Sequence, residues 1–205
     1  MLGLPRSTQV NRRVAKEKLY SHAKPTSIVR ELIKDQIDSI FWRNKLADST
    51  IGVASGETIK EIQVFEIVLR QKELDKRILP AISKAIPYKI LFLLTYQREV
   101  QAWMEVSNTF FCTDWLRAED FTLMFKGLNL DDMYENLARQ IAGGRLDVGG
   151  DIAEAVERDK KRQRLEREIA VLERKIAIEK QFNLQFEMNG ELKRQKIKLE
   201  ELTSE

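Results

Sequence analysis

The sequence predicts an α+β protein: two similar helix-plus-antiparallel-meander halves form one mixed domain over residues 25–150, and a charged helical arm follows over residues 151–205. Stretches in which apolar residues fall at helical spacing alternate with stretches of strand-like composition up to Gly149-Gly150. The composition then changes, because 26 of the 55 residues from 151 to 205 are charged and none is proline or tryptophan. The glycine pair therefore marks a flexible joint between the two parts.

The first half is predicted to hold one helix and three strands. Thr26 or Ser27 can cap a helix whose apolar residues fall on one face. The β-branched and aromatic residues that follow favour a strand, although Ile33, Ile37 and Ile40 also fit a single helix face. Turn residues divide the next apolar residues into two further strands. The expected elements are a helix over 27–36 and strands over 37–46, 50–54 and 59–70.

A helix, a second meander and a final helix are predicted for the second half. Pro87 ends the first of these helices, and Pro80 places its start or a kink near Leu79. Three apolar segments follow at hairpin-like spacing, and the central strand should be buried on both faces. Asn129 can cap the last helix, which Gly143-Gly144 ends. The expected elements are helices over 72–86 and 131–142, strands over 90–96, 101–106 and 109–115, and a weaker strand over 121–125.

The helical arm carries two apolar stripes that are out of phase. The first steps by four, three and four residues, which is the spacing of a short coiled-coil seam, and the second begins ten residues after Phe182. A hairpin is favoured over one continuous helix with a stutter. A seam this short is marginal in water, so the second helix, the globular domain, a second copy or another protein must cover it. The predicted protein interface comprises Leu165, Ile169, Leu172, Ile176, Leu192, Leu199 and Leu202.

The excess positive charge lies in a basic N-terminal arm, residues 1–24. The whole chain has a net charge of +3, whereas this arm holds six basic side chains and one acidic one, a net charge of +5. Such a cluster can neutralise phosphates of a nucleic acid, although the arm can also join the domain as a short helix. The candidate contacts are Arg12, Arg13, Lys16 and Lys18.

Several classes of site are excluded by residue counts. His22 is the only histidine and Cys112 the only cysteine, so the chain can form neither an internal disulfide nor a zinc site of the Cys/His type. No glycine-rich nucleotide-binding motif occurs. The start is too polar for a signal peptide, and no apolar run approaches the roughly 20 residues of a membrane span. We therefore expect a cytoplasmic protein without cofactor or metal.

A metal-dependent nuclease and an aromatic platform for single-stranded nucleic acid are less favoured than simpler interpretations of the same residues. Asp38 and Glu66 lie on predicted strands, but the residue two positions after Glu66 is Val68, where a carboxylate-x-Lys arrangement would place its cation. Charges on the solvated face of a sheet are the favoured interpretation. Trp42 and Trp103 lie in apolar strands, so core packing is favoured over stacking on a nucleic acid.

Four stretches resemble a bacterial family known as domain of unknown function 4391 (DUF4391). The resemblance implies an accessory subunit of a restriction or phage-defence complex, encoded beside DNA methyltransferases and helicases, and it implies no catalytic residue. The stretches are MLGLP at 1–5, IPYKILFLLTY at 86–96, KGLNLDDMYEN at 126–136 and EKQFNLQFEMN at 179–189.

The sequence thus favours a non-catalytic accessory or scaffold subunit that uses its C-terminal helices to bind a protein, such as a helicase or methyltransferase subunit, or a second copy of itself. Two alternatives stay open. The chain can be a nucleic-acid-binding module that uses the basic N-terminal arm, or a divergent metal-dependent nuclease.

Overall fold

The computed structural model of the protein describes residues 2–147 and 149–204. The chain divides into two compact units, Met1–Gly144 and Arg145–Glu205. The domain ranges predicted from the sequence also include residues 1, 148 and 205, which lie outside the described residues. The first unit contains η1 (Arg6–Thr8), β1 (Gln9–Arg13), α1 (Lys16–Ala23), α2 (Ser27–Gln36), β2 (Ile37–Leu46), α3 (Asp48–Ile51), β3 (Ile62–Leu69), α4 (Ile78–Lys84), β4 (Lys89–Tyr96), β5 (Glu99–Val106), β6 (Thr109–Cys112), β7 (Leu116–Arg117) and α5 (Leu130–Ala142). The second contains α6 (Ile152–Ile178) and α7 (Phe182–Ser204).

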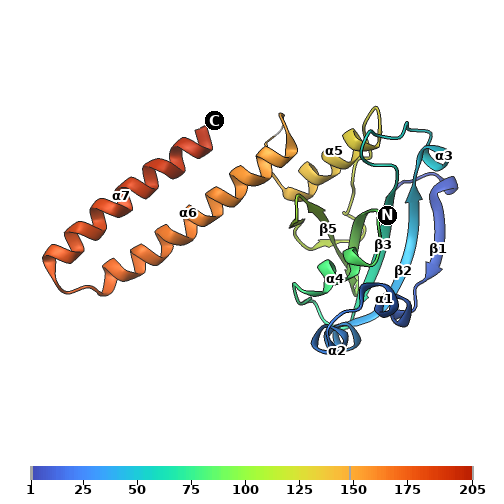
Figure 1. Cartoon of the computed structure of the whole chain (residues 1–205), viewed down its shortest axis with the longest axis horizontal. Helices are drawn as coiled ribbons and strands as arrows, with labels where there is room; N and C mark the ends of the chain where they lie inside the picture. The colour runs from blue at the N-terminus through green and yellow to red at the C-terminus, as the bar shows by residue number, and fades with distance from the viewer. Residues whose placement is uncertain (1, 148, 205) are drawn as a thin grey trace. The chain divides into compact units, whose positions relative to one another are not determined.

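The first unit is built on one seven-stranded sheet with the order β1-β2-β3-β4-β5-β6, and β7 also pairs with β5 (Figure 1). All neighbouring strands are antiparallel except β3 and β4, which are parallel and joined through α4. The prediction of a mixed α+β fold is therefore confirmed. The two predicted halves share this single sheet.

Helices cover the sheet on one face through a continuous apolar core. Leu19 of α1, Ile33 of α2 and Ile82 of α4 pack in one buried cluster with Phe65 of β3 and Phe92 of β4. Most of the alternate residues of β3 and β4 are buried as well, although Glu66 and Val68 are half-buried and Lys89 is exposed, so the opposite face of these central strands is largely shielded from water. Helix α5 packs against β5 and β6.

Several predicted elements are confirmed because their ends are strongly marked. Helix α2 and strand β2 have the predicted bounds, and the Thr26 side chain accepts a hydrogen bond from the main-chain N–H of Val29. Asn129 caps α5 in the same way by accepting from Asp132. Strands β4, β5 and β6 form the second antiparallel meander, as predicted.

The first meander is not formed as predicted. The expected strand over 50–54 is wrong: the chain forms the short helix α3 instead, where the Thr50 hydroxyl accepts from the N–H of Ala47 and Gly52 ends the helix at a φ of 69°. The expected strand over 59–70 begins only at Ile62, and it pairs in parallel with β4. The expected strand over 121–125 does not form.

Helix α4 is shorter than the predicted helix over 72–86. It begins at Ile78, which puts Pro80 in the first helical turn, where the missing N–H of proline breaks no helical hydrogen bond. The preceding Asp75 side chain accepts from the N–H of Arg77 and pairs with its guanidinium at 2.8 Å. These contacts hold the residues before α4 in a turn.

The predicted basic arm of residues 1–24 is part of the first unit. Gln9–Arg13 is the edge strand β1, which pairs with β2, and Leu19 anchors α1 because only 5% of its surface is exposed. This placement gives the basic residues fixed positions on the sheet edge.

The second unit is an antiparallel helical hairpin. The Lys196 ammonium of α7 pairs with Glu173 of α6 at 2.8 Å, and the Gln185 side chain donates to the carbonyl of Ile176 near the turn. The Glu179 carboxylate accepts from the main-chain N–H groups of the next two residues, which fixes the turn between the helices. Within the described residues, no helix is long and apolar enough to cross a membrane.

Candidate nucleic-acid interface

A cavity of about 360 Å³ lies between β1, β2, α1 and the end of α4, and it collects most of the predicted nucleic-acid contacts. Arg12, Arg13 and Lys18 line it together with His22, which the sequence analysis did not propose as a contact. The rest of the lining is largely apolar. It comprises Val14, Ala15, Leu19, Trp42, Phe65, Ala85 and Ile86.

Strand pairing places a cation beside two aromatic rings. Arg12 of β1 lies opposite Trp42 of β2, which in turn lies opposite Phe65 of β3. Residues directly opposite in neighbouring strands share one face of the sheet. The two rings are stacked, with centroids 6.4 Å apart and planes inclined by 11°. The Trp42 indole N–H donates to the carbonyl of Asn44 at 3.1 Å, so the ring is held in place from its edge.

Helix α1 supplies the other side of the cavity. Lys18 and His22 are one helical turn apart and therefore lie on the same side of the helix, while Leu19 is buried in the core. His22 Nδ1 lies 2.7 Å from the carbonyl oxygen of Lys18. A carbonyl oxygen only accepts, so Nδ1 donates this bond.

The ionisable groups that line this cavity are all potential cations. They are Arg12, Arg13, Lys18 and His22, and no described aspartate or glutamate lines it. The first three side chains are exposed, and none of them forms an ion pair with a described residue. An anionic group in the cavity thus meets several cations at once without displacing a carboxylate.

Lys16 does not join this group. Its ammonium donates to the carbonyl of Ile37 at 2.5 Å, and it lines a different cavity that also contains Asp38. Partial burial lowers the pKa of Lys16, and the nearby positive charge of Arg70 lowers it further. The structure therefore gathers three of the four predicted nucleic-acid residues and places the fourth against the main chain.

The two carboxylates of the nuclease alternative are not brought together. Glu66 pairs with Arg43 at 2.5 Å and accepts a hydrogen bond from Thr95 at 3.2 Å. Asp38 pairs with Arg70 at 3.4 Å, three residues along β2 from the position opposite Glu66. Across residues 2–147 and 149–204, no group of three histidine, cysteine or acidic side chains is arranged to hold a metal ion.

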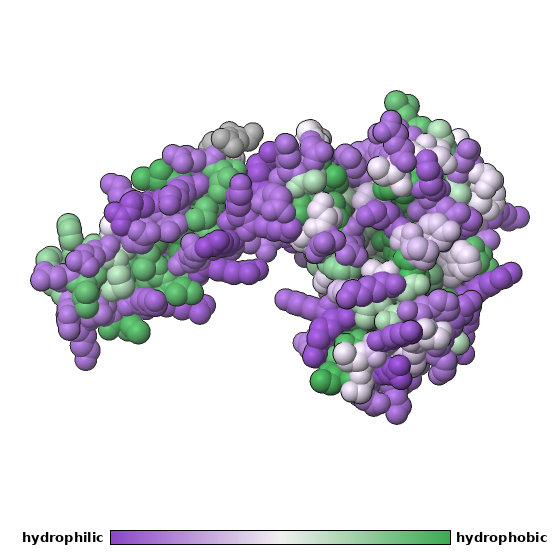
Figure 2. Space-filling model, in the orientation of Figure 1, coloured by the Kyte–Doolittle hydropathy of each residue, from purple (hydrophilic) through white to green (hydrophobic). Residues whose placement is uncertain are grey.

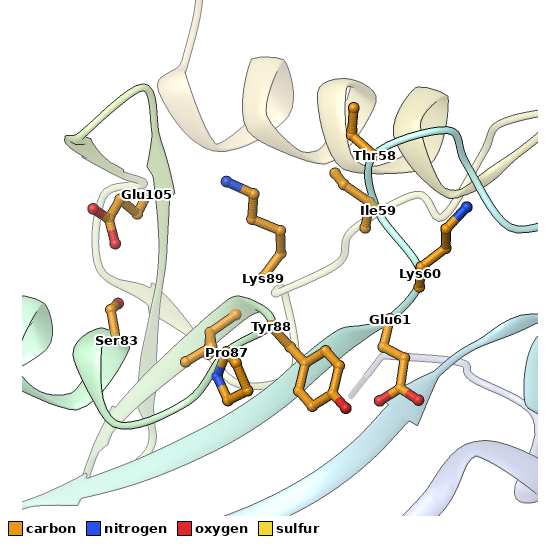
Figure 3. A pocket seen from close by; sticks show the side chains of 10 residues that line it. Thr58, Ile59, Lys60, Glu61, Ser83, Pro87, Tyr88, Lys89 and Glu105 are labelled. Carbon is orange, nitrogen blue, oxygen red and sulfur yellow. The ribbon is translucent and has the colours of Figure 1, made fainter. Parts of the chain in front are cut away.

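A larger cavity of about 530 Å³ has mixed charge. Figure 3 shows Lys60 and Glu61 from the loop before β3, Lys89 from β4 and Glu105 from β5 around it. The Lys60 ammonium donates to the carbonyl of Gly56 at 2.6 Å, Glu61 pairs with Lys45 at 2.6 Å, and the Lys89 ammonium lies 5.3 Å from the centroid of a tyrosine ring. Two cations and two anions leave no net charge to select a ligand, so the basic cavity is the stronger candidate.

A family model described as "Domain of unknown function (DUF4391)" matches residues 2–199 of the chain. The chain belongs to the DUF4391 family. The resemblance predicted from four short stretches is confirmed over nearly the whole length. No curated protein and no solved structure matches the chain. Membership of the DUF4391 family assigns no activity to the chain.

None of the seven predicted interface residues of this DUF4391 chain is fully exposed to solvent. Ile169 is 8% exposed, and the other six are half-buried. Different apolar side chains are exposed near the turn: Ile178 at 79%, Phe182 at 76% and Phe186 at 72%. Figure 2 shows hydrophobic patches on the hairpin between hydrophilic residues.

His22 and Trp42 are the site residues that sequence reasoning missed or assigned to another role. His22 is expected from the sequence to be an exposed or helix-packing residue of the basic arm, and its position one turn after Lys18 is the signal that links it to the site. Trp42 does contact the core, as predicted, but it is only half-buried and also lines the basic cavity. Both roles of Trp42 depend on the pairing of β2 with β1, which local sequence patterns do not reveal.

Proposed function

We propose that this DUF4391 protein binds nucleic acid through the basic cavity of its first unit. One observation carries the proposal: Arg12, Lys18 and His22 line a single cavity that no described carboxylate lines, and Arg13 lines both this cavity and the one that contains Asp38. Arginine and lysine side chains at such a site bind phosphate oxygens by charge and by hydrogen bonds. The proposed activity is binding, and it requires no catalytic residue.

The strength of such binding must depend on salt. Each phosphate contact to a single strand releases condensed counterions and contributes roughly 0.7 to the slope of log affinity against log salt concentration. Three permanent cations at the cavity therefore contribute a slope of about 2, which corresponds to a roughly 100-fold gain at 0.1 M salt relative to 1 M. Removing the three should cost that gain.

The test is fluorescence anisotropy with a labelled single-stranded DNA 20-mer over a salt series. The triple variant Arg12→Ala, Arg13→Ala, Lys18→Ala should flatten the salt slope by about 2. A matched control replaces three exposed basic residues of the same unit that do not line the cavity, Lys34, Arg98 and Lys126, with alanine. The control has the same net charge, so equal losses in the two triple variants would show that only bulk charge matters and would reject the cavity.

A second function, protein association, is supported by the hairpin. Three large apolar side chains near its turn, Ile178, Phe182 and Phe186, are each more than two-thirds exposed. On α7 the two phenylalanines are four residues apart and so lie on one helix face. A group of exposed apolar side chains near one turn is a candidate protein-binding surface.

We propose on this basis that the protein is an accessory or scaffold subunit whose hairpin docks a partner, such as a helicase or DNA methyltransferase subunit of a restriction or phage-defence complex. The predicted coiled-coil seam supports the hairpin, and the exposed phenylalanines make the contact. The double variant Phe182→Ser, Phe186→Ser should abolish co-purification with that subunit, whereas Glu187→Ser on the same helix should not. Retained co-purification of the double variant would exclude this surface.

A further inference from the structure

We infer that the basic cavity accepts one unpaired nucleotide, with its base against Trp42 and its phosphates on the surrounding cations, so that the protein prefers single-stranded to double-stranded nucleic acid. This inference rests on the proposed nucleic-acid binding and adds the form of the ligand to it. Three features of the cavity carry the argument: its aromatic wall, the division between apolar and cationic lining, and its size.

The aromatic wall is held in position before any ligand binds. The Trp42 ring is fixed by its hydrogen bond to the carbonyl of Asn44 and by its stacking against Phe65. Phe65 is only 6% exposed and belongs to the central core, so this support is rigid. A base that packs against Trp42 therefore orders no protein side chain, which lowers the entropic cost of binding.

The lining of the cavity has an apolar part and a cationic part, which match the base and the phosphate of a nucleotide. The side chains of Leu19, Ala85 and Ile86 extend the apolar wall formed by the two rings. The cations Arg12 and Lys18 come from a strand and a helix on the borders of this wall. A nucleotide likewise joins a flat ring with two large faces to an anionic phosphate, and aromatic platforms next to positive charge are the usual means of binding single strands.

The size of the cavity suits a single base. Its volume of about 360 Å³ lies at the lower end of the range for small-molecule sites. In a duplex the bases are paired and stacked within the helix, so a duplex offers the cavity only its phosphates. Once Arg12, Arg13 and Lys18 bind phosphates, His22 is the one remaining ionisable side chain of the lining that can contact a base edge. The binding should therefore show little sequence preference.

An acidic peptide with an aromatic residue is the competing ligand class, because it also joins a ring to negative charge. The observations favour the nucleotide. A nucleotide places its charge close to its ring, as the compact cavity requires. The three permanent cations of the lining form no ion pair with the described residues, so each can bind a phosphate of the chain. The peptide is kept as an outcome of the test.

The test compares oligo(dT) of 12 nucleotides with a DNA hairpin duplex that has the same number of phosphates. The full-length protein should bind the single strand more tightly than the duplex. Trp42→Leu should weaken single-strand binding by about 5- to 150-fold, which is the range for loss of one stacked base, and should leave duplex binding within about twofold. Trp42→Phe keeps an aromatic face and should restore most of the single-strand affinity.

A matched tryptophan in the same sheet provides the control. Trp103 of β5 is half-buried and its indole N–H donates to the Gln101 side chain at 2.8 Å, but it does not line the basic cavity. Trp103→Leu should leave both affinities unchanged. Quenching of tryptophan fluorescence by oligo(dT) should be lost in Trp42→Leu and kept in Trp103→Leu, which separates stacking from a general loss of structure.

The outcomes distinguish this inference from the proposed function. Equal affinity of the unmodified protein for single strand and duplex, with both lost in the Arg12, Arg13 and Lys18 triple variant, would overturn the inference and leave nucleic-acid binding intact. No binding of either DNA would overturn both. Displacement of oligo(dT) by a peptide of glutamate and tryptophan at lower concentration than by unlabelled oligo(dT) would also overturn the inference, in favour of a peptide ligand.

Discussion

The loop before β3 is attached to α5 by one carboxylate, and replacing it should destabilise the first unit measurably. Asp131 accepts hydrogen bonds from the N–H of Ile59 at 2.7 Å, from the N–H of Thr58 at 3.1 Å and from the Thr58 hydroxyl at 2.9 Å. Ile59 is buried, so its N–H group cannot turn to water when the carboxylate is removed. Asp131→Ala therefore removes three contacts and leaves at least one buried donor without its partner.

The magnitude follows from these contacts. Hydrogen bonds to a charged group contribute about 1.5–3 kcal/mol each when buried, and the partial exposure of Asp131 reduces this. We expect a loss of about 2–4 kcal/mol for Asp131→Ala, which corresponds to a fall of about 6–15 °C in the Tm of the unit. Asp131→Asn keeps one oxygen acceptor and should lose about half as much. Gly56→Ala should resemble the alanine variant, because its Cβ would lie 2.3 Å from the Asp131 carboxyl carbon.

The pH dependence provides an independent test of the same contact. Partial burial raises the pKa of Asp131, but the hydrogen bonds from Thr58 and Ile59 outweigh it and leave the pKa below the ordinary value of 3.8. A carboxyl group with a lowered pKa in the folded state stabilises the protein above its unfolded pKa and loses that effect as pH falls through the folded one. The difference in unfolding free energy between the unmodified protein and Asp131→Asn should thus be full at pH 7 and shrink below the ordinary value of 3.8.

Urea unfolding followed by circular dichroism at several pH values measures all of these quantities. Thr122→Ala, at an exposed loop position, is the control and should leave the free energy of unfolding within about 0.5 kcal/mol. If Asp131→Ala were as stable as the control at pH 7, or if its deficit did not change with pH, the argument from this hydrogen-bond set would be refuted.

Two further predictions concern buried residues. Leu19→Ala should lower the free energy of unfolding by about 2–4 kcal/mol, because the side chain is 5% exposed and links α1 to the core. The same variant should weaken binding at the basic cavity, which Leu19 also lines. Unchanged thermal unfolding would contradict the stability prediction. Asp159→Ala should destabilise the second unit by about 3–5 kcal/mol, because this fully buried carboxylate pairs with Arg145 at 2.5 Å and Arg162 at 2.6 Å. Loss of helical signal on heating measures the effect, and Glu154→Ala on the exposed side of α6 is the control.

Elements with strong local end signals were predictable from the sequence. Helix α2 has a Thr26 cap and an apolar face, and α5 lies between an Asn129 cap and Gly143, so both were predicted to within one residue. The strands of the second meander were predictable because β4 is a short apolar run and β5 alternates between buried and partly exposed residues.

Elements that depend on distant pairing could not be predicted. Strand β1 is a polar edge strand in which only Val10 is even half-buried, so hydrophobic periodicity carries no signal there. Its register also breaks near Asn11, which has a φ of 49°. The parallel pairing of β3 with β4 spans a short helix, and the residues of each strand do not encode which neighbour it takes.

The candidate site was likewise predictable only in part, because its charges are visible in the sequence but its assembly depends on distant strand pairing. Charge counting identified Arg12, Arg13 and Lys18, because an excess of cations is visible in sequence. Their convergence with Trp42 on one cavity required the position of β1 beside β2. For the same reason, Lys16 was included among the candidates although its ammonium binds the main chain.

Ultraviolet cross-linking of oligo(dT) to the full-length protein, with the attached peptide identified by mass spectrometry, locates the bound nucleic acid on the protein surface. We expect cross-links to residues that line the basic cavity, above all Trp42 and the segment that contains Lys18 and His22. Cross-links confined to the helical hairpin, or unchanged yields at Trp42 in the Arg12, Arg13 and Lys18 triple variant, would contradict it.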